Sequence, residues 1–386
     1  MNVAPFAPGR AAWGRTGRVH RATIDVYERE AGGYAERRGV QRPERVRQFA
    51  DAVAPGAVRL DLGCGPGHYL PELGTPAVAV DAARAMVAAA AEAHPGVPAA
   101  QADLADLPFG RATVAGVWAS KAHQHLPAHD LPLALADVHR ILTVAGRFDL
   151  TMFTGVPPGA PPAEEVTAAG SGDDLPGRFF AWWDPDHLVE VVTAAGFTVE
   201  CCDVVKLGPE QGDHARIEVT ATARRALPDH VGAGMRLLCC GLNPSLHAAD
   251  AGVGYVSRSN RFWPALAAAG LATRDREPRH LLRHHRIGMT DLVKRATARA
   301  DELSAAEHRA GVERLERLCA WLRPAAVAVV GLAGWRAAVD RRAVVGWQPH
   351  PLGATPVYLL PSTSGLNARV SVAELTTHLR TAATGA

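Results

Sequence analysis

An asparagine stands directly after a short apolar run in the second half of the chain. The run Leu237-Leu238-Cys239-Cys240 has the length and composition of a buried strand, and Gly241-Leu242-Asn243-Pro244-Ser245 follows it. We therefore expect Asn243 at the carboxyl end of a strand, the edge at which open α/β sheets bind ligands. A carboxamide offers one acceptor and two donors on a short side chain, so it can orient a water molecule or the edge of a base.

Four further segments follow this asparagine. They are Gly252-Val253-Gly254-Tyr255, Ser259-Asn260-Arg261-Phe262-Trp263, Thr290-Asp291-Leu292-Val293 and Leu360-Pro361-Ser362-Thr363-Ser364-Gly365-Leu366-Asn367-Ala368-Arg369. In this order and at this spacing, the five segments resemble the mismatch-specific uracil and thymine DNA glycosylases, over roughly Met235 to Arg380. Gly-x-Asn-Pro alone is usually only a turn, whereas the coincidence of five segments is highly specific.

The resemblance implies a role for each position. Asn243 would position the water that attacks the N-glycosidic bond, and Tyr255 would stack on the flipped pyrimidine, which is worth roughly 1–3 kcal/mol per base. Leu366 would fill the gap left in the duplex, and Arg369 would contact phosphate or the opposite strand. The other implied positions are Leu242, Ala248 and Asn260 for base binding, and Ser364, Gly365 and Asn367 for the wedge.

The implied partner is double-stranded DNA with G:U or G:T mismatches. Asparagine cannot deprotonate water, so the reaction would depend on departure of the leaving group and turnover would be slow. Ala248 occupies a position at which thymine-directed members carry alanine and uracil-directed members carry serine. We expect uracil opposite guanine to be the best simple substrate, with thymine or 5-substituted uracil excised more slowly. The alternative is that the C-terminal half only binds DNA or flipped bases and does not excise them.

A glycine-rich turn in the first half also follows a strand-like run. Residues 57–62 lead into Gly63-Cys64-Gly65-Pro66-Gly67, where backbone amides and the next helix favour a carboxylate or phosphate. The following run, 77–80, ends in Asp81, where doubly wound sheets place an acid for ribose hydroxyls. Two elements complete the series, Gln101-Ala102-Asp103-Leu104 and Val114-Ala115-Gly116-Val117-Trp118-Ala119-Ser120. The order resembles the class I S-adenosylmethionine-dependent methyltransferases, over about Tyr27 to Val205.

This second resemblance implies S-adenosylmethionine as the cofactor and no metal. The implied cofactor-binding positions are Asp61 before the turn, Gly63, Gly65 and Gly67 at the methionine moiety, Asp81 at the ribose, and Asp103 with Leu104 at the adenine. An NAD-binding domain would use the same turn, but its pattern is Gly-x-Gly-x-x-Gly. A degenerate scaffold that no longer binds the cofactor is also left open.

The methyl acceptor is not identified by the sequence. DNA amino-methylating enzymes resemble one another in an Asp/Asn-Pro-Pro-aromatic segment after the fourth strand, where this chain has Ala119-Ser120-Lys121. This argues for a small molecule or an RNA nucleoside. His123 is a candidate base for methyl transfer, and a solvated loop is the competing interpretation of the histidines around it. The Pro/Gly/Ala-rich stretch 155–177 is expected to cap the acceptor pocket.

The chain of 386 residues is too long for one ordinary core. We expect an α/β fold with two domains, a Rossmann-like methyltransferase sheet followed by an α/β/α sandwich like that of uracil-DNA glycosylases. The expected parts are a disordered basic tail (1–21), the methyltransferase domain (22–222), a linker (223–234) and the glycosylase domain (235–386).

Composition adds limits on partners and compartment. The formal net charge of +2 gives no global signal for nucleic acid, so any basic surface must be local. The arginines at 274, 276, 279, 283 and 286 could form a solvated face or contact DNA. None of the six cysteines has Cys-x-x-Cys spacing, which gives no support for a structural metal and fits a reducing cytoplasm. No apolar stretch is long enough to span a membrane.

Overall fold

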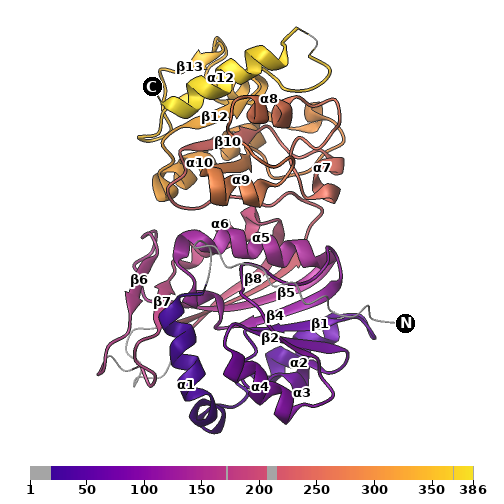
Figure 1. The fold of residues 1–386 in the computed structure, drawn as a ribbon, viewed down its shortest axis with the longest axis vertical. Helices are drawn as coiled ribbons and strands as arrows, with labels where there is room; N and C mark the ends of the chain where they lie inside the picture. Colours follow the sequence, from indigo (N-terminus) through magenta and orange to yellow (C-terminus); the bar gives the residue numbers. More distant parts are fainter. Residues whose placement is uncertain (1–18, 171–172, 207–214, 368, 386) are drawn as a thin grey trace.

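Two separate sheets organise the chain, one in each half, and their units are stacked along the long axis of the molecule (Figure 1). The structure is a computed structural model that describes residues 19–170, 173–206, 215–367 and 369–385. Most of the predicted basic tail, 1–21, lies outside the described residues; Arg21 already begins a helix.

Seven strands form the N-terminal sheet, in the order β3-β2-β1-β4-β5-β9-β8. Their bounds are β1 (Arg59–Leu62), β2 (Ala77–Asp81), β3 (Ala99–Gln101), β4 (Val114–Ser120), β5 (Leu142–Thr154), β8 (Phe197–Lys206) and β9 (Ala215–Ala223). The first five are parallel, and β9 is antiparallel to both β5 and β8. The chain passes from one side of β1 to the other between β3 and β4, and the carboxyl ends of the strands at such a switch point form a ligand crevice.

Helices cover both faces of this sheet, and its strands contribute to two cores, one with Leu60 and Leu62 and the other with Ala77 and Ala79. The helices are α1 (Arg21–Arg37), α2 (Pro43–Ala52), α3 (Leu70–Leu73), α4 (Arg84–Ala93), α5 (Leu131–Ile141) and α6 (Pro185–Ala194), with 3-10 turns at His123–His125 and Ala128–Asp130. A second, two-stranded sheet pairs β6 (Ala163–Val166), which lies in the stretch 155–177 predicted to cap the pocket, with β7 (Phe179–Trp182), which follows that stretch.

The C-terminal sheet has the order β11-β10-β12-β14-β13 and is parallel except for the edge strand β13. Its strands are β10 (Leu237–Gly241), β11 (Ile287–Asp291), β12 (Val327–Val330), β13 (Gly346–Trp347) and β14 (Val357–Leu360). Side chains alternate between two cores, because successive residues of a strand point to opposite faces. In β10, Leu238 and Cys240 enter one core, whereas Leu237 and Cys239 enter the other.

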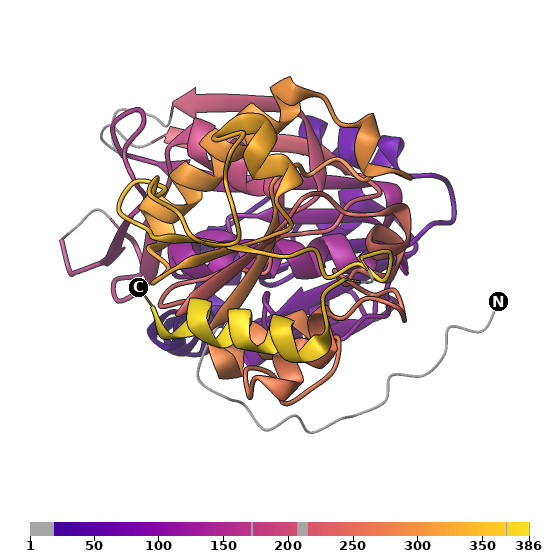
Figure 2. The same cartoon turned by 90° about the horizontal axis from the view of Figure 1, so that it is seen from above.

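Helices on the two faces complete the predicted α/β/α sandwich. They are α7 (Leu246–Ala251), α8 (Phe262–Ala268), α9 (Pro278–His285), α10 (Ala305–Leu322), α11 (Ala333–Ala338) and α12 (Val372–Thr384), with a 3-10 turn at Ala300–Glu302. The two longest begin at capping boxes, Ser304 with Glu307 and Ser371 with Glu374, which satisfy the first free amides of each helix. Viewed from above, α12 runs along one side of the C-terminal unit (Figure 2).

The two units contact each other directly. Trp321 of α10 packs edge-on against Trp183 and His187, with ring centroids 5.8 and 4.7 Å away. The predicted linker is a packed part of the structure, because Leu227 and Val231 are buried and His230 forms an antiparallel bridge with Met289 of β11. No helix in the described part of the chain is long and apolar enough to cross a membrane.

Candidate active sites

Asn243 lies two residues after β10, with its side-chain nitrogen fully engaged. Nδ2 donates to Thr297 Oγ1 (2.7 Å), to the Arg295 carbonyl (3.0 Å) and to the Pro244 carbonyl (3.2 Å). Carbonyls only accept, so these contacts fix which end of the amide is nitrogen. Oδ1 has no hydrogen-bond partner among the described residues and is left to accept from a water molecule.

Thr297 is the residue that holds this geometry, and no sequence motif drew attention to it. Its hydroxyl donates to the Arg299 carbonyl (2.8 Å), so its lone pairs face Asn243. Its backbone amide donates to the Pro244 carbonyl (3.1 Å), and its carbonyl accepts from Leu246 (3.2 Å). The loop after β11 therefore clamps both the turn and the side chain that it presents.

Tyr255 lies beside the same strand end, in an unusual backbone conformation. Its φ is 57°, and its half-buried ring stacks on Phe262 with centroids 4.0 Å apart. Its hydroxyl is buried without a hydrogen-bond partner in the described structure, close to Gly241. A bulky residue at positive φ costs about 1–3 kcal/mol and persists only where its surroundings hold it. One ring face is thus occupied by Phe262, and only the remaining surface is available for a base.

Asp291 ends β11, opposite Gly241 in the sheet register. A Cβ placed on Gly241 would lie 2.3 Å from Asp291 Oδ1 and 2.9 Å from the Tyr255 hydroxyl oxygen, so only glycine allows this approach. Burial raises the pKa of Asp291 to about 6, with Asp229 adding to the rise and Lys294 opposing it. A buried acid therefore lies beside the end of β10, close to the Tyr255 hydroxyl.

The predicted wedge is an exposed turn between β14 and α12, at the end of the molecule away from the N-terminal unit (Figure 1). Leu366 is 97% exposed, and Arg369 is exposed with no ion pair among the described residues. The turn is closed from within, because Asn367 donates through its amide to Ser364 (3.0 Å) and through Nδ2 to Ser362 (3.1 Å).

Arg261 braces this turn from the start of α8. Its guanidinium donates to the carbonyls of Val370, Ser364 (2.7 Å) and Asn367. A Cβ on Gly365 would lie 2.6 Å from the Ser259 side chain, so the wedge turn also packs tightly on the loop before α8. Arg261 belongs to the segment Ser259-Asn260-Arg261-Phe262-Trp263, which predicted no role for it.

The other predicted base-binding residues lie in the same region. Asn260 accepts from the Phe262 amide (3.0 Å) and so shapes the loop that carries Tyr255 and Arg261. Ala248 is buried in the first turn of α7, whose N-cap is the Ser245 hydroxyl (3.1 Å). Leu242 is half-buried and packs against the core that includes α10 and α11.

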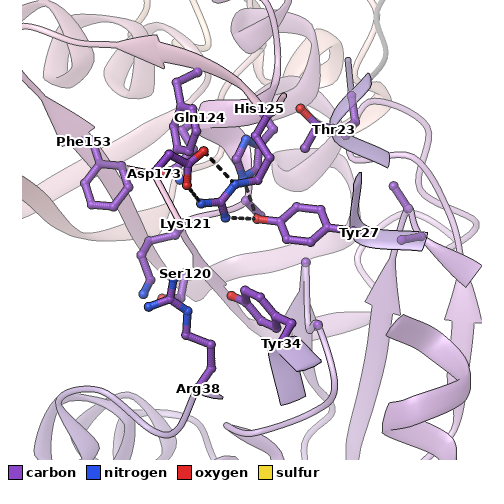
Figure 3. A pocket seen from close by; sticks show the side chains of 18 of the residues that line it. Thr23, Tyr27, Tyr34, Arg38, Ser120, Lys121, Gln124, His125, Phe153 and Asp173 are labelled. Carbon is purple, nitrogen blue, oxygen red and sulfur yellow. Dashed lines mark hydrogen bonds and ion pairs between the residues drawn. The ribbon is translucent and has the colours of Figure 1, made fainter. Parts of the chain in front are cut away.

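The N-terminal unit holds a cavity of about 920 Å³ at the switch point of its sheet (Figure 3). Gly63, Gly65, Asp81 and Leu104 line it, as the sequence analysis expected. Gly63 and Gly65 have φ of 74° and 53°, and a Cβ on Gly63 would lie 2.2 Å from that of Ala122. The turn therefore requires glycine in order to approach β4 and leave the cavity open.

Two acids beside this turn fit an S-adenosylmethionine molecule. Asp81 accepts from the amides of Gly65 (2.9 Å) and Ala83 (2.8 Å), which fixes its carboxylate at the cavity wall. Asp61 is 1% exposed, and both its oxygens lack a hydrogen-bond partner among the described groups. Burial raises its pKa to about 8, with Asp81 adding to the rise. An unsatisfied buried acid is expensive, and a cationic ligand group nearby would relieve it.

Asp61, Gly67 and Asp103 do not line the cavity. Gly67 has φ of 85° and faces α3 and α4, where a Cβ would lie 2.9 Å from Leu70 and His94. Asp103 is buried and accepts from the amides of Ala105 (2.9 Å) and Val19 (3.2 Å). Its structural effect is to shape the loop that places Leu104 on the cavity wall.

The prediction that His123 is the base for methyl transfer is not supported by its position. It is 0% exposed, contributes nothing to the cavity wall and packs edge-on against Phe148, 6.4 Å between ring centroids. Burial lowers its pKa to about 4. His123 is a core residue, because the 3-10 turn directs it under the sheet while His125 reaches the cavity.

His125 and Tyr27 form a pair that the sequence analysis missed (Figure 3). His125 Nδ1 lies 2.7 Å from the Phe179 carbonyl, which can only accept, so Nδ1 carries the proton and Nε2 is free to accept. Nε2 lies 3.1 Å from the Tyr27 hydroxyl, which also accepts from Arg178 (2.9 Å). Burial lowers the pKa of His125 to about 4. A neutral imidazole is thus available to a hydroxyl on the cavity wall.

Two of the five noted arginines face the N-terminal unit. Arg279 donates to the Ala105 carbonyl (2.7 Å) and forms ion pairs with Asp106 (3.0 Å) and Asp137 (2.9 Å). Arg283 donates to the same carbonyl (3.3 Å). Helix α9 therefore holds the loop that includes Leu104.

Two family models of known proteins match separate parts of the chain. Residues 60–146 match the family model of a methyltransferase domain, and residues 228–381 match that of the uracil DNA glycosylase superfamily. One similar solved structure is 1,6-didemethyltoxoflavin-N1-methyltransferase of Burkholderia thailandensis, which has 1,6-didemethyltoxoflavin and S-adenosylhomocysteine bound. Its sequence is 21% identical to this chain. The match covers 56% of this chain and 94% of that one, with a TM-score of 0.40. The cyclase SpnF is 16% identical, with 53% and 94% covered and a TM-score of 0.41.

Proposed function

We propose that this chain, which joins a methyltransferase domain to a domain of the uracil DNA glycosylase superfamily, has two activities. The C-terminal domain (235–386) excises uracil, and more slowly thymine or 5-substituted uracil, opposite guanine in double-stranded DNA. The N-terminal domain (22–222) transfers a methyl group from S-adenosylmethionine. Six free cysteines fit work in a reducing cytoplasm.

The observation that carries the glycosylase proposal is the free amide oxygen of Asn243. Its nitrogen is held by three acceptors, so Oδ1 can accept from one water without rotating away. Preorganised contacts of this kind lower the cost of reaching the transition state. Asparagine does not remove the proton, so the glycosidic bond breaks largely before water attacks. The proton released from the water passes to solvent or to the departing base.

The wedge supports selection of mismatched bases. Flipping a base costs a few kcal/mol and least at a mismatched pair. An exposed apolar side chain on a braced turn can occupy the vacated space, as Leu366 does in this proposal, while Arg369 meets backbone phosphate. Ala248 would leave room near carbon 5 of the base, which is the basis for including thymine.

Methyl transfer uses the cavity of the N-terminal domain. S-adenosylmethionine would supply an electrophilic methyl group on sulfur. Asp81 would hold the ribose and Leu104 the adenine, with Gly63 and Gly65 against the methionine moiety. Asp61, buried just before this turn, would favour a cationic amino group there without lining the cavity. His125 would receive the acceptor's proton through the Tyr27 hydroxyl, which would pass its own proton to Nε2 and regain one from the acceptor.

A strand-nicking assay on a labelled U:G duplex tests the glycosylase half. Asn243→Ala should abolish excision while leaving mismatch binding nearly intact, because the substitution removes neither stack nor wedge. Wild-type protein that binds the duplex without excising the base would establish a binding module instead. Calorimetry with S-adenosylhomocysteine tests the other half, and absence of binding would leave a degenerate scaffold.

A further inference from the structure

The cavity extends beyond the predicted cofactor residues, and this outer part carries a cation without a counter-ion. Lys121 follows β4 directly and lines the cavity. Its Nζ donates to Gln41 Oε1 (2.9 Å), and it forms no ion pair with any described carboxylate. Burial lowers the pKa of Lys121 to about 8, with Arg38 and Arg216 contributing. An ammonium group in this position is therefore short of negative charge.

The two arginines that contribute to this pKa shift already have carboxylate partners. Arg38 is paired with Asp174 (2.6 Å), and Arg216 with Glu218 (2.7 Å), so these carboxylates are already used. Lys121 also has a positive φ of 58°, a conformation that costs energy for a residue with a Cβ. The backbone is thus held in an unfavourable conformation where the uncompensated cation meets the cavity.

An aromatic wall lies in the same part of the cavity. Phe180 and Trp182 of β7 are stacked at 5.6 Å between ring centroids, and Phe153 of β5 lies 6.3 and 5.9 Å from them. All three line the cavity. In Figure 3, Phe153, Lys121 and Arg38 lie along one side, and Tyr27, Tyr34 and His125 along the other. Such surfaces favour flat, unsaturated molecules.

We infer that the methyl acceptor is a small, planar, unsaturated molecule with an anionic group, a carboxylate or a phosphate, which Lys121 binds while the aromatic wall of Phe153, Phe180 and Trp182 holds the planar body. This inference rests on the proposed methyltransferase function. The volume of the cavity lies at the upper end of the roughly 300–1,000 Å³ that is typical of ligand sites. A site for both a cofactor and a second small molecule needs a volume of this size.

Calorimetry on the full-length protein loaded with S-adenosylhomocysteine tests the inference. The probes are 2-naphthoate, 2-naphthyl phosphate and neutral 2-naphthamide, which share a ring system and differ in charge. One anion should bind about tenfold or more tightly than the amide, as expected for a charged hydrogen bond, and the tighter anion identifies the group. Lys121→Met should remove the preference, whereas Arg47→Met, which deletes an exposed charge of α2 outside the cavity, should not.

Both variants should bind S-adenosylhomocysteine like the wild type, which shows that the domain is folded. The inference is wrong if S-adenosylhomocysteine binds but the three probes bind equally or not at all. It is also wrong if Lys121→Met keeps the preference for the anion. In both cases the methyltransferase proposal stands. Wild-type protein that fails to bind S-adenosylhomocysteine would overturn both.

Discussion

Replacing Arg261 by alanine should loosen the wedge turn without touching DNA-facing residues. The guanidinium donates to three carbonyls of the turn and the residues after it, those of Ser364, Asn367 and Val370. Hydrogen bonds to a charged group contribute about 1.5–3 kcal/mol each, but carbonyls on a half-exposed turn regain water, so about 1 kcal/mol each is the better figure. The sum of about 3 kcal/mol would shift the equilibrium between the preformed and the disordered turn roughly 100-fold, which sets the upper limit on the loss of affinity.

The measured consequence is weaker binding to a mismatched duplex. Fluorescence anisotropy with a U:G duplex and Asn243→Ala protein, which is expected to be inactive, should show a Kd higher by up to about 100-fold when Arg261→Ala is added. The slope of log K against log salt should stay unchanged, because no phosphate contact is lost.

Arg369→Ala is the matched control. It removes a free, exposed guanidinium from the same turn and should reduce the salt slope by about 1 while preserving the fold. If Arg261→Ala changes the salt slope as Arg369→Ala does, or leaves the affinity intact, then Arg261 does not act by bracing the turn.

Three further predictions concern the cofactor, the contact between domains and the substrate range. Asp81→Ala should weaken S-adenosylmethionine binding by about 1–3 kcal/mol, measured by calorimetry, through loss of charged hydrogen bonds to ribose; excision should be unaffected, and equal loss of both activities would contradict separate sites. Arg279→Ala should raise the Kd for S-adenosylmethionine about two- to fivefold, because it frees the loop that includes Leu104 and partly exposed ion pairs contribute up to about 1 kcal/mol. An unchanged Kd would mean that α9 does not support this loop. Ala248→Ser should slow excision of thymine more than of uracil in single-turnover reactions, and an equal effect would remove Ala248 from the pocket.

The sequence was sufficient to predict the position of site residues that belong to one short, contiguous motif. The turn at Gly63 and Gly65 and the asparagine after β10 lie at strand ends as expected, because an apolar run followed by glycine leaves the backbone little alternative. The exposed turn with Leu366 follows β14 in the same way. These features are local, so a pattern of residues can specify them.

Residues that act across the fold could not be predicted in this way. Thr297 and Arg261 hold Asn243 and the wedge turn through contacts 54 and 103–109 residues away along the chain. His123 and His125 are separated by one residue, and only the direction of a 3-10 turn decides which of them reaches the cavity. The packed segment around Asp229 looked like a linker because its proline and glycines suggest a loop, whereas its partners Lys294 and Arg314 come from distant elements.

The central claim, base excision directed by the opposing guanine, is tested most directly by single-turnover rates on matched duplexes. Full-length protein in excess should be mixed with U:G, T:G and U:A duplexes of otherwise identical sequence, and abasic product should be quantified over time. Excision should be fastest from U:G, slower from T:G, and much slower from U:A, where flipping must break a stable pair. Equal rates on U:G and U:A, or no product from any duplex at saturating protein, would contradict it.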